Sequence, residues 1–533
     1  MTTDQNPAAA TGELPARGYL PAVDVASALP TAASEPAADA TDALLIPVFT
    51  GDGELEVPAS DALPGALTES IYRSLRAVGA SGAAEKVSVV PAPADAPVAT
   101  LIAVGLGDAA QVDSETVRRA AGAASRAAHD VAKAQGAPLT VTTTLPEFGL
   151  APAVEGVLLG GYRYAGIHTP ANTGEDKEES AAKARFVFIT EDTEDSRAEF
   201  EAARIAAEAT AMARDLVNTP SNELYPETYA AFLKKEAEAV GIEVELLDEV
   251  ELSRQGYGGI LAVGRSSTRP PRLVRLKWAP DAPANSDTVA LVGKGITFDT
   301  GGISLKPGSG MWDMVMDMGG SAAVAAAIIA AARLQLPVPI TATLPLAENM
   351  PSGSATRPGD VITHYGGITS EILNTDAEGR VVLADAIARA CEDDPTFLID
   401  TATLTGAQMV ALGDRTAGVM GTDEFRDQVA ATGRSVGESA WAMPLLEEHE
   451  EDVKSAVADI RNINAKREGG MEYAATYLSR FVGDEVDWAH IDVAGPAWNG
   501  GGPRGYHPKR ATGVPTRTIL ATLRKIADRD AAE

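Results

Sequence analysis

The sequence is short of residues on which several classes of protein depend. It holds one cysteine, Cys391, in 533 residues, so it cannot form an internal disulfide, which fits a reducing compartment. Its six histidines form no His-Glu-x-x-His pattern, which excludes the common zinc-peptidase helix. Aromatic residues make up only 5% of the chain, so we expect an aliphatic core built mainly from Ala, Val, Leu and Ile.

Signals for export and for membrane insertion are also missing. The N-terminus has no basic cluster followed by an apolar core, so we expect a cytoplasmic protein without a membrane partner. The apolar stretch at residues 322–332 is too short to cross a bilayer. It follows Gly319-Gly320-Ser321 and is predicted to be a buried helix.

Positive charge is scarce. The chain has 44 basic and 75 acidic residues, which gives a formal net charge of −31. Such a surface repels phosphate backbones, and no basic stripe with interleaved aromatic residues is present, so broad nucleic-acid binding is not expected. The acidity is typical of a highly soluble protein.

A compact group of charged residues stands at 374–380, which reads Asn-Thr-Asp-Ala-Glu-Gly-Arg. Asp376 and Glu378 are two positions apart, and Arg380 follows after Gly379, which allows close backbone approach. Acids beside a fixed cation favour a hard-metal site that also holds an anion. Taken alone, an Asp-x-Glu pair is a weak signal, because most such pairs are solvated surface acids.

A second group of polar residues follows the short apolar run at 289–292, which predicts a buried strand. Lys294 stands between two glycines, Asp299 precedes a pair of glycines, and Lys306 precedes a proline. Asp317 lies among apolar residues, where a lone charge is costly unless it is paired or metal-bound. Each residue alone fits an ordinary loop, turn or cap. Together they favour a site on loops beyond the carboxyl end of a strand.

These segments resemble the two signatures of the leucyl aminopeptidase (cytosol aminopeptidase) family of dinuclear metallo-exopeptidases. The signatures lie at 293–302 and 374–380, and four further segments agree with the family, at 348–353, 400–407, 488–495 and 511–517. The resemblance runs from about Asp215 to the C-terminus, while the N-terminal third matches only in general character. It implies an enzyme that removes N-terminal, leucine-like residues from peptides with a free N-terminus.

The resemblance also implies roles for individual residues. The implied metal ligands are Lys294, Asp299, Asp317, Asp376 and Glu378. Asp299 and Glu378 would bridge two ions, and Lys306 and Arg380 would be the catalytic side chains. The residues implied for the substrate side-chain pocket are Met314, Asn374, Ala377, Thr403, Leu404 and Ala494. These are mostly apolar or small, which suits a leucine side chain, although Met314 and Leu404 fit a plain core equally well.

The residue types are compatible with that chemistry. Oxygen ligands suit divalent ions such as Mn²⁺ or Zn²⁺, and the family has two per subunit. Lys294 must be neutral to bind an ion, which a neighbouring dication favours. Two ions roughly 3.5–4 Å apart would activate a shared water, and Lys306 would stabilise the oxyanion that develops. No histidine or free carboxylate stands out as the general base; the resemblance implies bicarbonate in that role, held by Arg380.

Alternation of strand-like and helical segments predicts an α/β protein. Residues 1–43, rich in Ala and Pro without periodicity, predict a mobile tail. Residues 44–195 predict a smaller N-terminal α/β domain, 196–215 a linker helix, and 216–533 the larger catalytic domain.

Local patterns refine this division. In the N-terminal domain, 98–104 predicts a strand, 116–134 a helix, and 170–183 a polar loop. Gly105-Leu106-Gly107 loosely fits a dinucleotide fingerprint, but the expected acid falls inside the helical pattern, so we interpret it as a plain turn. In the catalytic domain, apolar runs predict a mainly parallel sheet flanked by helices; they lie near 289–293, 339–346, 397–401 and 487–493.

Two other functions stay open at this point. Some relatives in the family also bind DNA as regulators, so a DNA-binding role on the same scaffold is a second hypothesis, disfavoured by the net charge. Sets of Asp, Glu, Lys and Arg also serve phosphoryl transfer, which makes a two-metal phosphatase the third. The resemblance further implies a homohexamer whose active sites face an interior cavity.

Overall fold

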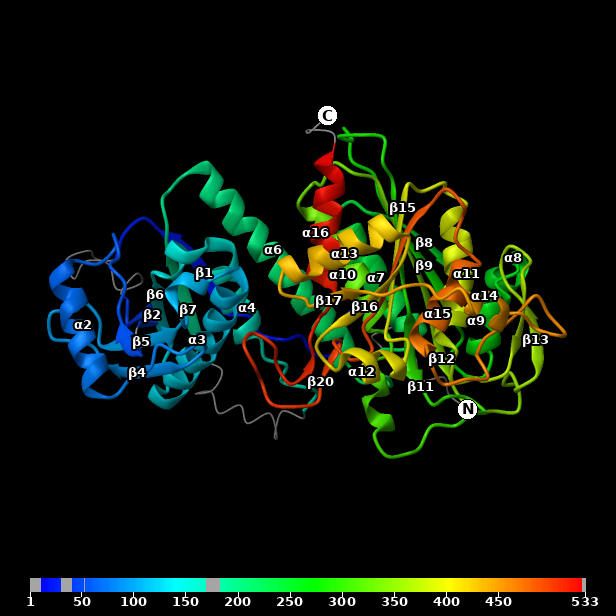
Figure 1. Ribbon diagram of the computed structural model, residues 1–533, viewed down its shortest axis with the longest axis horizontal. Helices are drawn as coiled ribbons and strands as arrows, with labels where there is room; N and C mark the ends of the chain where they lie inside the picture. The colour runs from blue at the N-terminus through cyan, green and yellow to red at the C-terminus, as the bar shows by residue number, and fades with distance from the viewer. Residues whose placement is uncertain (1–10, 30–40, 52, 169–182, 530–533) are drawn as a thin grey trace. The chain divides into compact units, whose positions relative to one another are not determined.

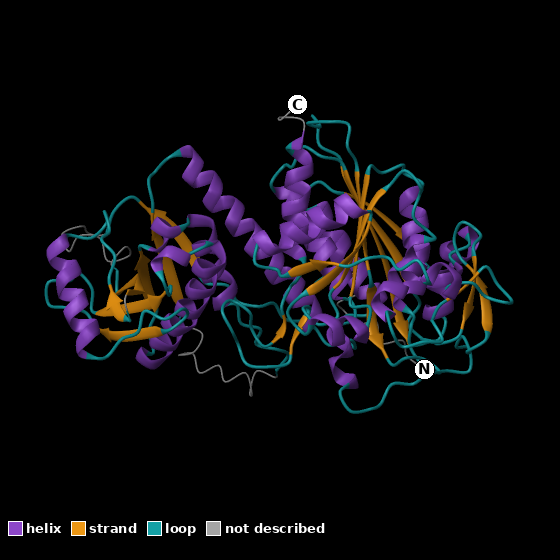
Figure 2. Cartoon of the chain, viewed as in Figure 1, coloured by secondary structure: helices purple, strands orange, loops and turns teal. Residues whose placement is uncertain are grey.

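The computed structural model describes residues 11–29, 41–51, 53–168 and 183–529. The chain divides into two compact units, each with a sheet between helices (Figures 1 and 2). The N-terminal unit comprises Gly18–Ala211 with Gly501–Lys509; the C-terminal unit comprises Met212–Gly500 with the described residues at both ends of the chain. The predicted α/β class, with a smaller N-terminal and a larger C-terminal part, is confirmed.

The N-terminal unit is built on a mostly parallel sheet with strand order β1-β7-β6-β2-β5-β4, and β3 pairs with β2 beside this path. Strands β4 and β3 run antiparallel to their neighbours. The strands are β1 (Ala22–Ala26), β2 (Ala43–Gly51), β3 (Glu54–Glu56), β4 (Val87–Pro91), β5 (Thr100–Gly105), β6 (Leu139–Thr143) and β7 (Ala184–Ile189). The helices are α2 (Gly65–Ala77), α3 (Ser114–Gln135) and α4 (Leu150–Gly161), with η1 (Ala109–Gln111) and η2 (Leu145–Phe148).

Strand β2 is buried on both faces, as its continuous apolar run requires. Leu45 and Phe49 pack into a core with α3 and α4 on one face. Leu44 and Ile46 pack into a second core with α2 on the other face. The predicted strand at 98–104 is β5, and the predicted helix at 116–134 is α3.

Strand β1 departs from the expected tail. It lies within residues 1–43 and pairs in parallel with β7 at the edge of the sheet. The reason is local alternation, because Val23 and Val25 pack against the core while Ala22 and Asp24 are exposed.

Residues 11–21 of the expected tail are also held to the fold: Glu13 lies 2.7 Å from Lys235, and Tyr19 forms a β-bridge with Arg163. Residues 1–10 and 30–40 of the tail, and 170–182 of the polar loop, lie outside the described residues.

Helix α6 (Glu194–Asn218) carries the chain from one unit to the other, and the division between the units falls within it. The helix is longer at both ends than the linker expected at 196–215. Asn218, the last residue of the helix, is buried and accepts a hydrogen bond from Arg510 in the C-terminal unit.

The C-terminal unit has a larger sheet with strand order β17-β16-β19-β15-β10-β12-β9-β8, and β11 pairs with β12. Its strands are β8 (Glu243–Leu247), β9 (Arg272–Trp278), β10 (Val289–Gly293), β11 (Gly295–Asp299), β12 (Ile340–Asn349), β15 (Phe397–Ala402), β16 (Ala417–Gly421), β17 (Ala440–Ala442) and β19 (Asp487–Asp492). The central strands β12, β10, β15 and β19 are parallel, as predicted from their apolar runs.

Two small sheets lie outside the main one. The first joins β13 (Asp360–Thr363), β14 (Thr369–Ile372) and β18 (Ile460–Arg461), and the second joins β20 (Trp498–Asn499) and β21 (Arg510–Ala511). The helices are α7 (Pro226–Glu238), α8 (Glu249–Gln255), α9 (Gly258–Gly264), η3 (Met311–Met316), α10 (Gly319–Arg333), α11 (Gly379–Cys391), α12 (Gly406–Leu412), α13 (Asp423–Ser435), α14 (His449–Asp452), α15 (Gly470–Ser479) and α16 (Thr516–Ala527).

Helices cover both faces of the larger sheet. In Figure 1, α10, α13 and α16 lie on one side of its strands, and α9, α11 and α15 lie on the other. Leu383 and Ile387 of α11 pack with Leu398 of β15 and Trp488 of β19 in one continuous core. Helix α10 belongs to one of these layers and α11 to the other. The first turns of both helices lie beside the candidate site described below.

The predicted buried helix at 322–332 is α10, which is buried along almost its whole length. Gly320 lets its first turn approach β15, because a Cβ there would stand 2.2 Å from the carbonyl oxygen of Thr401. Within the described residues, Met311–Arg333 is long and apolar enough to span a membrane, but 83% of its apolar window is buried in the fold. That burial is the property of a core helix.

Candidate active site and metal centre

Charged side chains gather where strands of the larger sheet end. Lys294 follows β10, Asp299 ends β11, and Thr403 follows β15. Asp317 ends the short helix η3, while Glu378 is the N-cap residue of α11. Because the carboxyl ends of parallel strands share one edge of a sheet, the topology alone brings these loops together.

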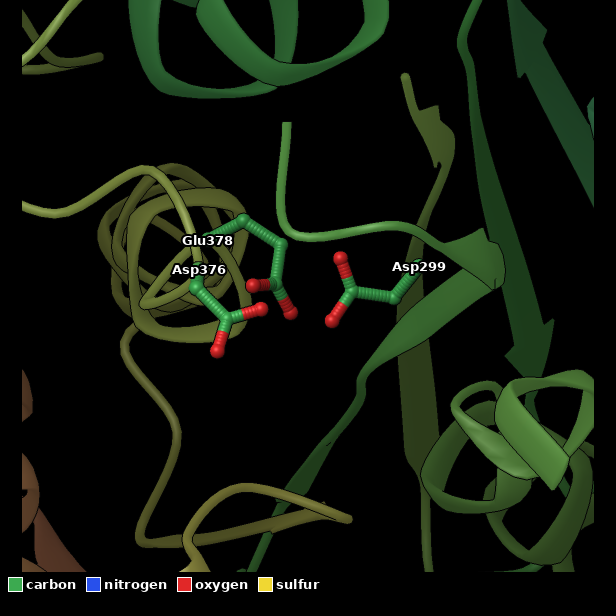
Figure 3. A group of neighbouring side chains, drawn as sticks. All are labelled: Asp299, Asp376 and Glu378. Atoms are coloured by element: carbon green, nitrogen blue, oxygen red, sulfur yellow. The ribbon is translucent and has the colours of Figure 1, made fainter. Parts of the chain in front are cut away.

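Three carboxylates converge from separate segments. Ligand atoms of Asp299, Asp376 and Glu378 all lie within 4.8 Å of one another. Figure 3 shows the Glu378 carboxylate between the other two, with Asp376 on the same loop and Asp299 opposite. Asp299 and Glu378 are buried, and Asp376 is half-buried. A cluster of this kind is unfavourable unless cations compensate its charge.

Lys294 links this cluster to the fourth predicted acid. Its Nζ lies 2.8 Å from Asp317 Oδ1 and 2.8 Å from Glu378 Oε1. Gly379 makes room for it, since a Cβ at that position would stand 2.6 Å from the lysine Cε. The glycine in the 374–380 segment thus accommodates the Lys294 side chain, which would have to shift if position 379 carried a Cβ.

Lys306 compensates the open side of the cluster. Its Nζ lies 2.8 Å from Asp299 Oδ2 and 2.5 Å from Asp376 Oδ1. The side chain is 22% exposed, against 3% for Lys294. Lys306 is thus the cation that faces the surroundings of the site, whereas Lys294 is part of its floor.

The electrostatics of the cluster follow from burial and close charges. Burial raises the pKa of Asp299 and of Asp376, and raises the pKa of Asp317 well above its ordinary range. Burial alone would lower the pKa of Lys294 and Lys306, but the adjacent carboxylates outweigh it and raise both pKa values. In this arrangement the lysines are ammonium ions that partly neutralise the acids.

The residues present fit divalent ions. The carboxylate atoms Asp317 Oδ2 and Glu378 Oε2 are buried and accept no hydrogen bond from the described residues. A buried carboxylate oxygen without a donor is costly, and a cation is the partner that removes the cost. Four carboxylates and an amine that can lose its proton form a donor set suited to Mn²⁺ or Zn²⁺.

Arg380 lies in the first turn of α11 and is buried. Its Nη1 donates to the carbonyl oxygen of Asn462 at 2.8 Å, and its guanidinium lies 5.9 Å from the centre of the Tyr473 ring. Burial lowers its pKa. Its Nε has no hydrogen-bond partner among the described residues, and no carboxylate there forms an ion pair with it. This guanidinium retains donor capacity for an anion.

The residues predicted for the substrate pocket lie in η3, in the loop before α11, and on the segments that follow β15 and β19. They are Met314, Asn374, Ala377, Thr403, Leu404 and Ala494. The Thr403 hydroxyl donates to Asp317 Oδ1 at 2.8 Å, which places it beside a predicted metal ligand. The backbone N–H groups of Leu404 and Ala494 both donate to Asp492 Oδ1, at 3.2 and 3.1 Å, so one carboxylate holds two strand ends together.

Two asparagines at the site were not singled out from the sequence. Asn349 donates through Nδ2 to Asp299 Oδ1 at 2.8 Å and to the carbonyl oxygen of Thr375 at 3.0 Å. Asn462 bonds to the loop at 373–377 and to Arg380. Asn349 lies inside the segment 348–353, so the family resemblance of that segment could have indicated it as a site residue. Asn462 lies in no recognised motif.

A second polar cluster has the connectivity of a serine-hydrolase triad but is sealed. His364 Nδ1 lies 2.7 Å from Asp385 Oδ1, and His364 Nε2 lies 2.9 Å from Ser370 Oγ and 2.9 Å from the Tyr477 hydroxyl. All four side chains are buried. Since no substrate reaches this serine, the cluster ties α11 to the β13–β14 hairpin and α15 and has no place in catalysis.

A sheet edge that gathers four carboxylates, two lysines and a buried arginine is typical of a metal-dependent hydrolase of the α/β class. Comparison with known proteins specifies the class further. Residues 211–520 match the catalytic domain of the cytosol aminopeptidase family, and residues 45–170 match the N-terminal domain of the same family. The chain belongs to the cytosol aminopeptidase family and is accordingly an aminopeptidase, a hydrolase that acts on peptides.

Individual relatives agree over nearly the full length. The chain is 55% identical to a probable cytosol aminopeptidase of Corynebacterium diphtheriae, over 97% of this chain and 99% of that protein. It is 50% identical to a probable cytosol aminopeptidase of Rhodococcus jostii, over 91% of this chain and 95% of that protein. Among solved structures, the bottromycin maturation enzyme BotP in complex with Mn is similar, with a TM-score of 0.78 and 37% identity, over 92% of this chain and 100% of BotP.

Proposed function

We propose that this aminopeptidase is a leucyl aminopeptidase that depends on two divalent metal ions. The observation that carries the proposal is the convergence of Asp299, Asp376 and Glu378 within 4.8 Å, with Glu378 Oε2 buried and without a donor. The ligands would be these three residues together with Lys294 and Asp317. That BotP was solved with Mn supports Mn²⁺ as an ion to test first.

Bound divalent ions supply the Lewis acidity needed to hydrolyse an unactivated peptide bond. Lys294 would deliver its amine to an ion only after losing the proton that it shares with Asp317 and Glu378, so metal binding and proton release are coupled. Asp317, Lys294 and Thr403 hold one another through short contacts. This network fixes the ligand set before any ion arrives.

Lys306 has the position and charge to stabilise an oxyanion. Its ammonium lies over the carboxylate cluster and stays protonated, and it is partly exposed. An ammonium aimed at a carbonyl oxygen is worth most when negative charge develops there, in a site with little water. We therefore assign Lys306 to the scissile carbonyl of the substrate.

Arg380 has the position and free donors to hold a planar anion. A guanidinium with unused N–H groups suits the bidentate binding of a carboxylate or bicarbonate. No hydrogen bond or ion pair of the described chain joins a histidine to these carboxylates, and the carboxylates themselves are assigned as metal ligands, so we follow the family resemblance and take the proton acceptor to be an external anion. We assign Arg380 to an exogenous bicarbonate ion that would take up this proton.

The leucine preference rests on the character of the neighbouring side chains. Met314, Leu404 and Ala494 are apolar, and two of them are joined through Asp492 at the ends of β15 and β19. Such a surface favours an aliphatic side chain over a charged one by the free energy of burying apolar area, about 25 cal/mol per Å². A dipeptide-library cleavage profile measures the preference directly.

We also propose that the protein works in the cytoplasm as a homohexamer, as its family resemblance implies. Light scattering on the purified protein tests the assembly. A mass of one or two subunits at micromolar concentration would refute the hexamer and leave the proposed chemistry untouched.

The decisive test of the chemistry is metal removal and restoration. After chelation, the protein should release no nitroaniline from leucine p-nitroanilide, and Mn²⁺ or Zn²⁺ added in steps should restore the activity with two ions bound per subunit. A phosphate-ester substrate assayed in parallel distinguishes the proposed aminopeptidase from a two-metal phosphatase. Full activity in the chelated protein, or restoration of phosphatase activity alone, would refute the proposal.

A further inference from the structure

Asn462 stands directly after β18 and is completely buried. Its backbone N–H donates to the carbonyl oxygen of Glu371 at 3.0 Å, which completes the last residue pair between β14 and β18, Glu371 with Arg461. After Ile372, the last residue of β14, the chain leaves the small sheet and enters the segment that carries Asp376, Glu378 and Arg380. Asn462 therefore sits where regular pairing ends and the candidate site begins.

Past the end of β18, the side chain of Asn462 makes the hydrogen bonds to the neighbouring segment. Its Oδ1 accepts from the backbone N–H groups of Leu373 and Asn374, at 2.8 and 3.3 Å. Its Nδ2 donates to the carbonyl oxygens of Asn374 and Ala377, at 2.7 and 3.4 Å. One amide thus uses both its acceptor and its donor group on the backbone of a single loop; among side chains, only asparagine and glutamine combine a carbonyl acceptor with an NH₂ donor.

The backbone of the same residue holds the arginine of the site. Arg380 Nη1 donates to the carbonyl oxygen of Asn462 at 2.8 Å, which is the hydrogen bond that fixes this guanidinium within the described chain. The side chain and the carbonyl of Asn462 thus act on two different parts of the proposed machinery, the acid-bearing loop and Arg380. Moving Asn462 would displace both together.

We propose that Asn462 is a positioning residue that sets Asp376, Glu378 and Arg380 in register with one another. The inference rests on the proposed two-metal function. Unlike Asn349, which touches Asp299 directly, Asn462 contacts no carboxylate of the cluster, so its effect must pass through the backbone of residues 373–377. Residues that orient ligands in this way typically cost about 10- to 100-fold in metal affinity or activity when lost.

The test compares Asn462→Ser and Asn462→Asp with the matched variant Asn464→Ser. Asn464 is two positions further on, bonds to Asp452 and to the backbone of Lys466, and contacts neither the loop nor Arg380. For each variant we would measure kcat and KM for leucine p-nitroanilide, Mn²⁺ affinity by calorimetry, and thermal unfolding in chelator. Asn462→Asp keeps the shape but sets a carboxylate against two carbonyl oxygens.

We expect both Asn462 variants to lose about 10- to 100-fold in kcat and about tenfold or more in Mn²⁺ affinity. KM should change little, the metal-free protein should still unfold cooperatively, and Asn464→Ser should match the wild type. The proposal is overturned if the Asn462 variants keep wild-type kcat and Mn²⁺ affinity, if Asn464→Ser loses as much, or if both Asn462 variants lose the metal-free fold. A wild-type protein that binds no Mn²⁺ would instead refute the proposed function.

Discussion

The two units of the chain share an architecture and differ in what they do with acidic side chains. Each has a largely parallel sheet with turns or loops at the carboxyl ends of its strands. After β5 of the N-terminal unit, Asp108 and Asp113 are exposed, and they accept hydrogen bonds from the backbone N–H groups of Ala110 in η1 and Thr116 in the first turn of α3. At the equivalent edge of the C-terminal unit, Asp299 and Glu378 are buried around lysines.

The difference teaches where catalytic capacity comes from in this fold. An exposed acid that caps a helix has its donors supplied by backbone and water, so it has no need of a metal ion. A buried acid with an unpartnered oxygen carries a cost that a cation relieves, and the protein tolerates that cost only where the cation is used. The sheet positions both kinds of acid, and burial decides which kind is chemically active.

Glu378→Gln should have the largest effect, because it removes the charge of the central carboxylate without changing its shape. We expect kcat/KM for leucine p-nitroanilide to fall by more than about 100-fold, beyond the loss that is usual for residues that only orient ligands. Calorimetry should show that Mn²⁺ binding is lost at one position or more. Glu371→Gln, on the preceding strand, is the matched control and should behave like the wild type. A fully active Glu378→Gln enzyme would show that the buried acids of the C-terminal unit are not needed for catalysis, and the contrast with the exposed acids of the N-terminal unit would fail.

Lys306→Ala should come next. Loss of the ammonium that faces the cluster should lower kcat by about 100- to 1000-fold, as for a lost oxyanion donor. Mn²⁺ stoichiometry should be unchanged, because Lys306 is not among the proposed ligands. Lys454→Ala removes an exposed lysine for comparison. An unchanged kcat would reject the catalytic role of Lys306, and a loss of bound Mn²⁺ would make it a structural cation.

Arg380→Lys keeps the positive charge and removes the planar fork. We expect kcat to fall by about 100-fold, in the range that a lost proton acceptor costs. Mn²⁺ affinity should fall much less than kcat. Steady-state kinetics at several bicarbonate concentrations, together with a Mn²⁺ titration, provide the measurement. Equal losses in kcat and in Mn²⁺ affinity would count against a role for Arg380 in holding the anion.

The smallest expected effect is that of a substitution in the N-terminal unit, and it concerns stability and not catalysis. Asp113→Ala removes the acceptor for Thr116 N–H at the start of α3 and should cost about 0.5–2 kcal/mol of stability without altering kcat. Hydrogen bonds from Thr116 lower the pKa of Asp113 below its ordinary value of 3.8. The stabilisation is therefore present above that value and disappears as the pH falls through the lowered pKa. Chemical denaturation of both proteins at pH 7 and pH 3 measures it.

The sequence predicted the centre of each sheet better than its margins. Strands β10, β12 and β15 are continuous apolar runs that must be buried on both faces, so their positions followed from hydrophobicity. Strand β1 is five residues long and stands in a stretch rich in Ala and Pro, so its alternation was too short to outweigh composition. Pairing with β7 stabilises it, and that partner lies far away in the sequence.

In the candidate site, the identities of the residues could be predicted, but their geometry could not. Residue types, glycines and a family resemblance pointed to Asp299, Asp376, Glu378, Lys294 and Lys306, but none of these reveals a distance. That Lys294 bridges Asp317 and Glu378, and that Lys306 bridges Asp299 and Asp376, are properties of packing. The role of Asn462 depends on hydrogen bonds to backbone groups of a distant loop, which no local pattern of side chains encodes.

The edge position of β1 bears on how this protein is handled in the laboratory. A shortened gene that starts just before β2 would leave the backbone amides and carbonyls of Ala184–Ile189 without a neighbour along one side. Bare edges of this kind recruit strands from other molecules. Removing the residues before β2 for crystallisation would thus favour precipitation. An affinity tag fused before residue 1 keeps β1 in place, and the edge of β7 stays paired.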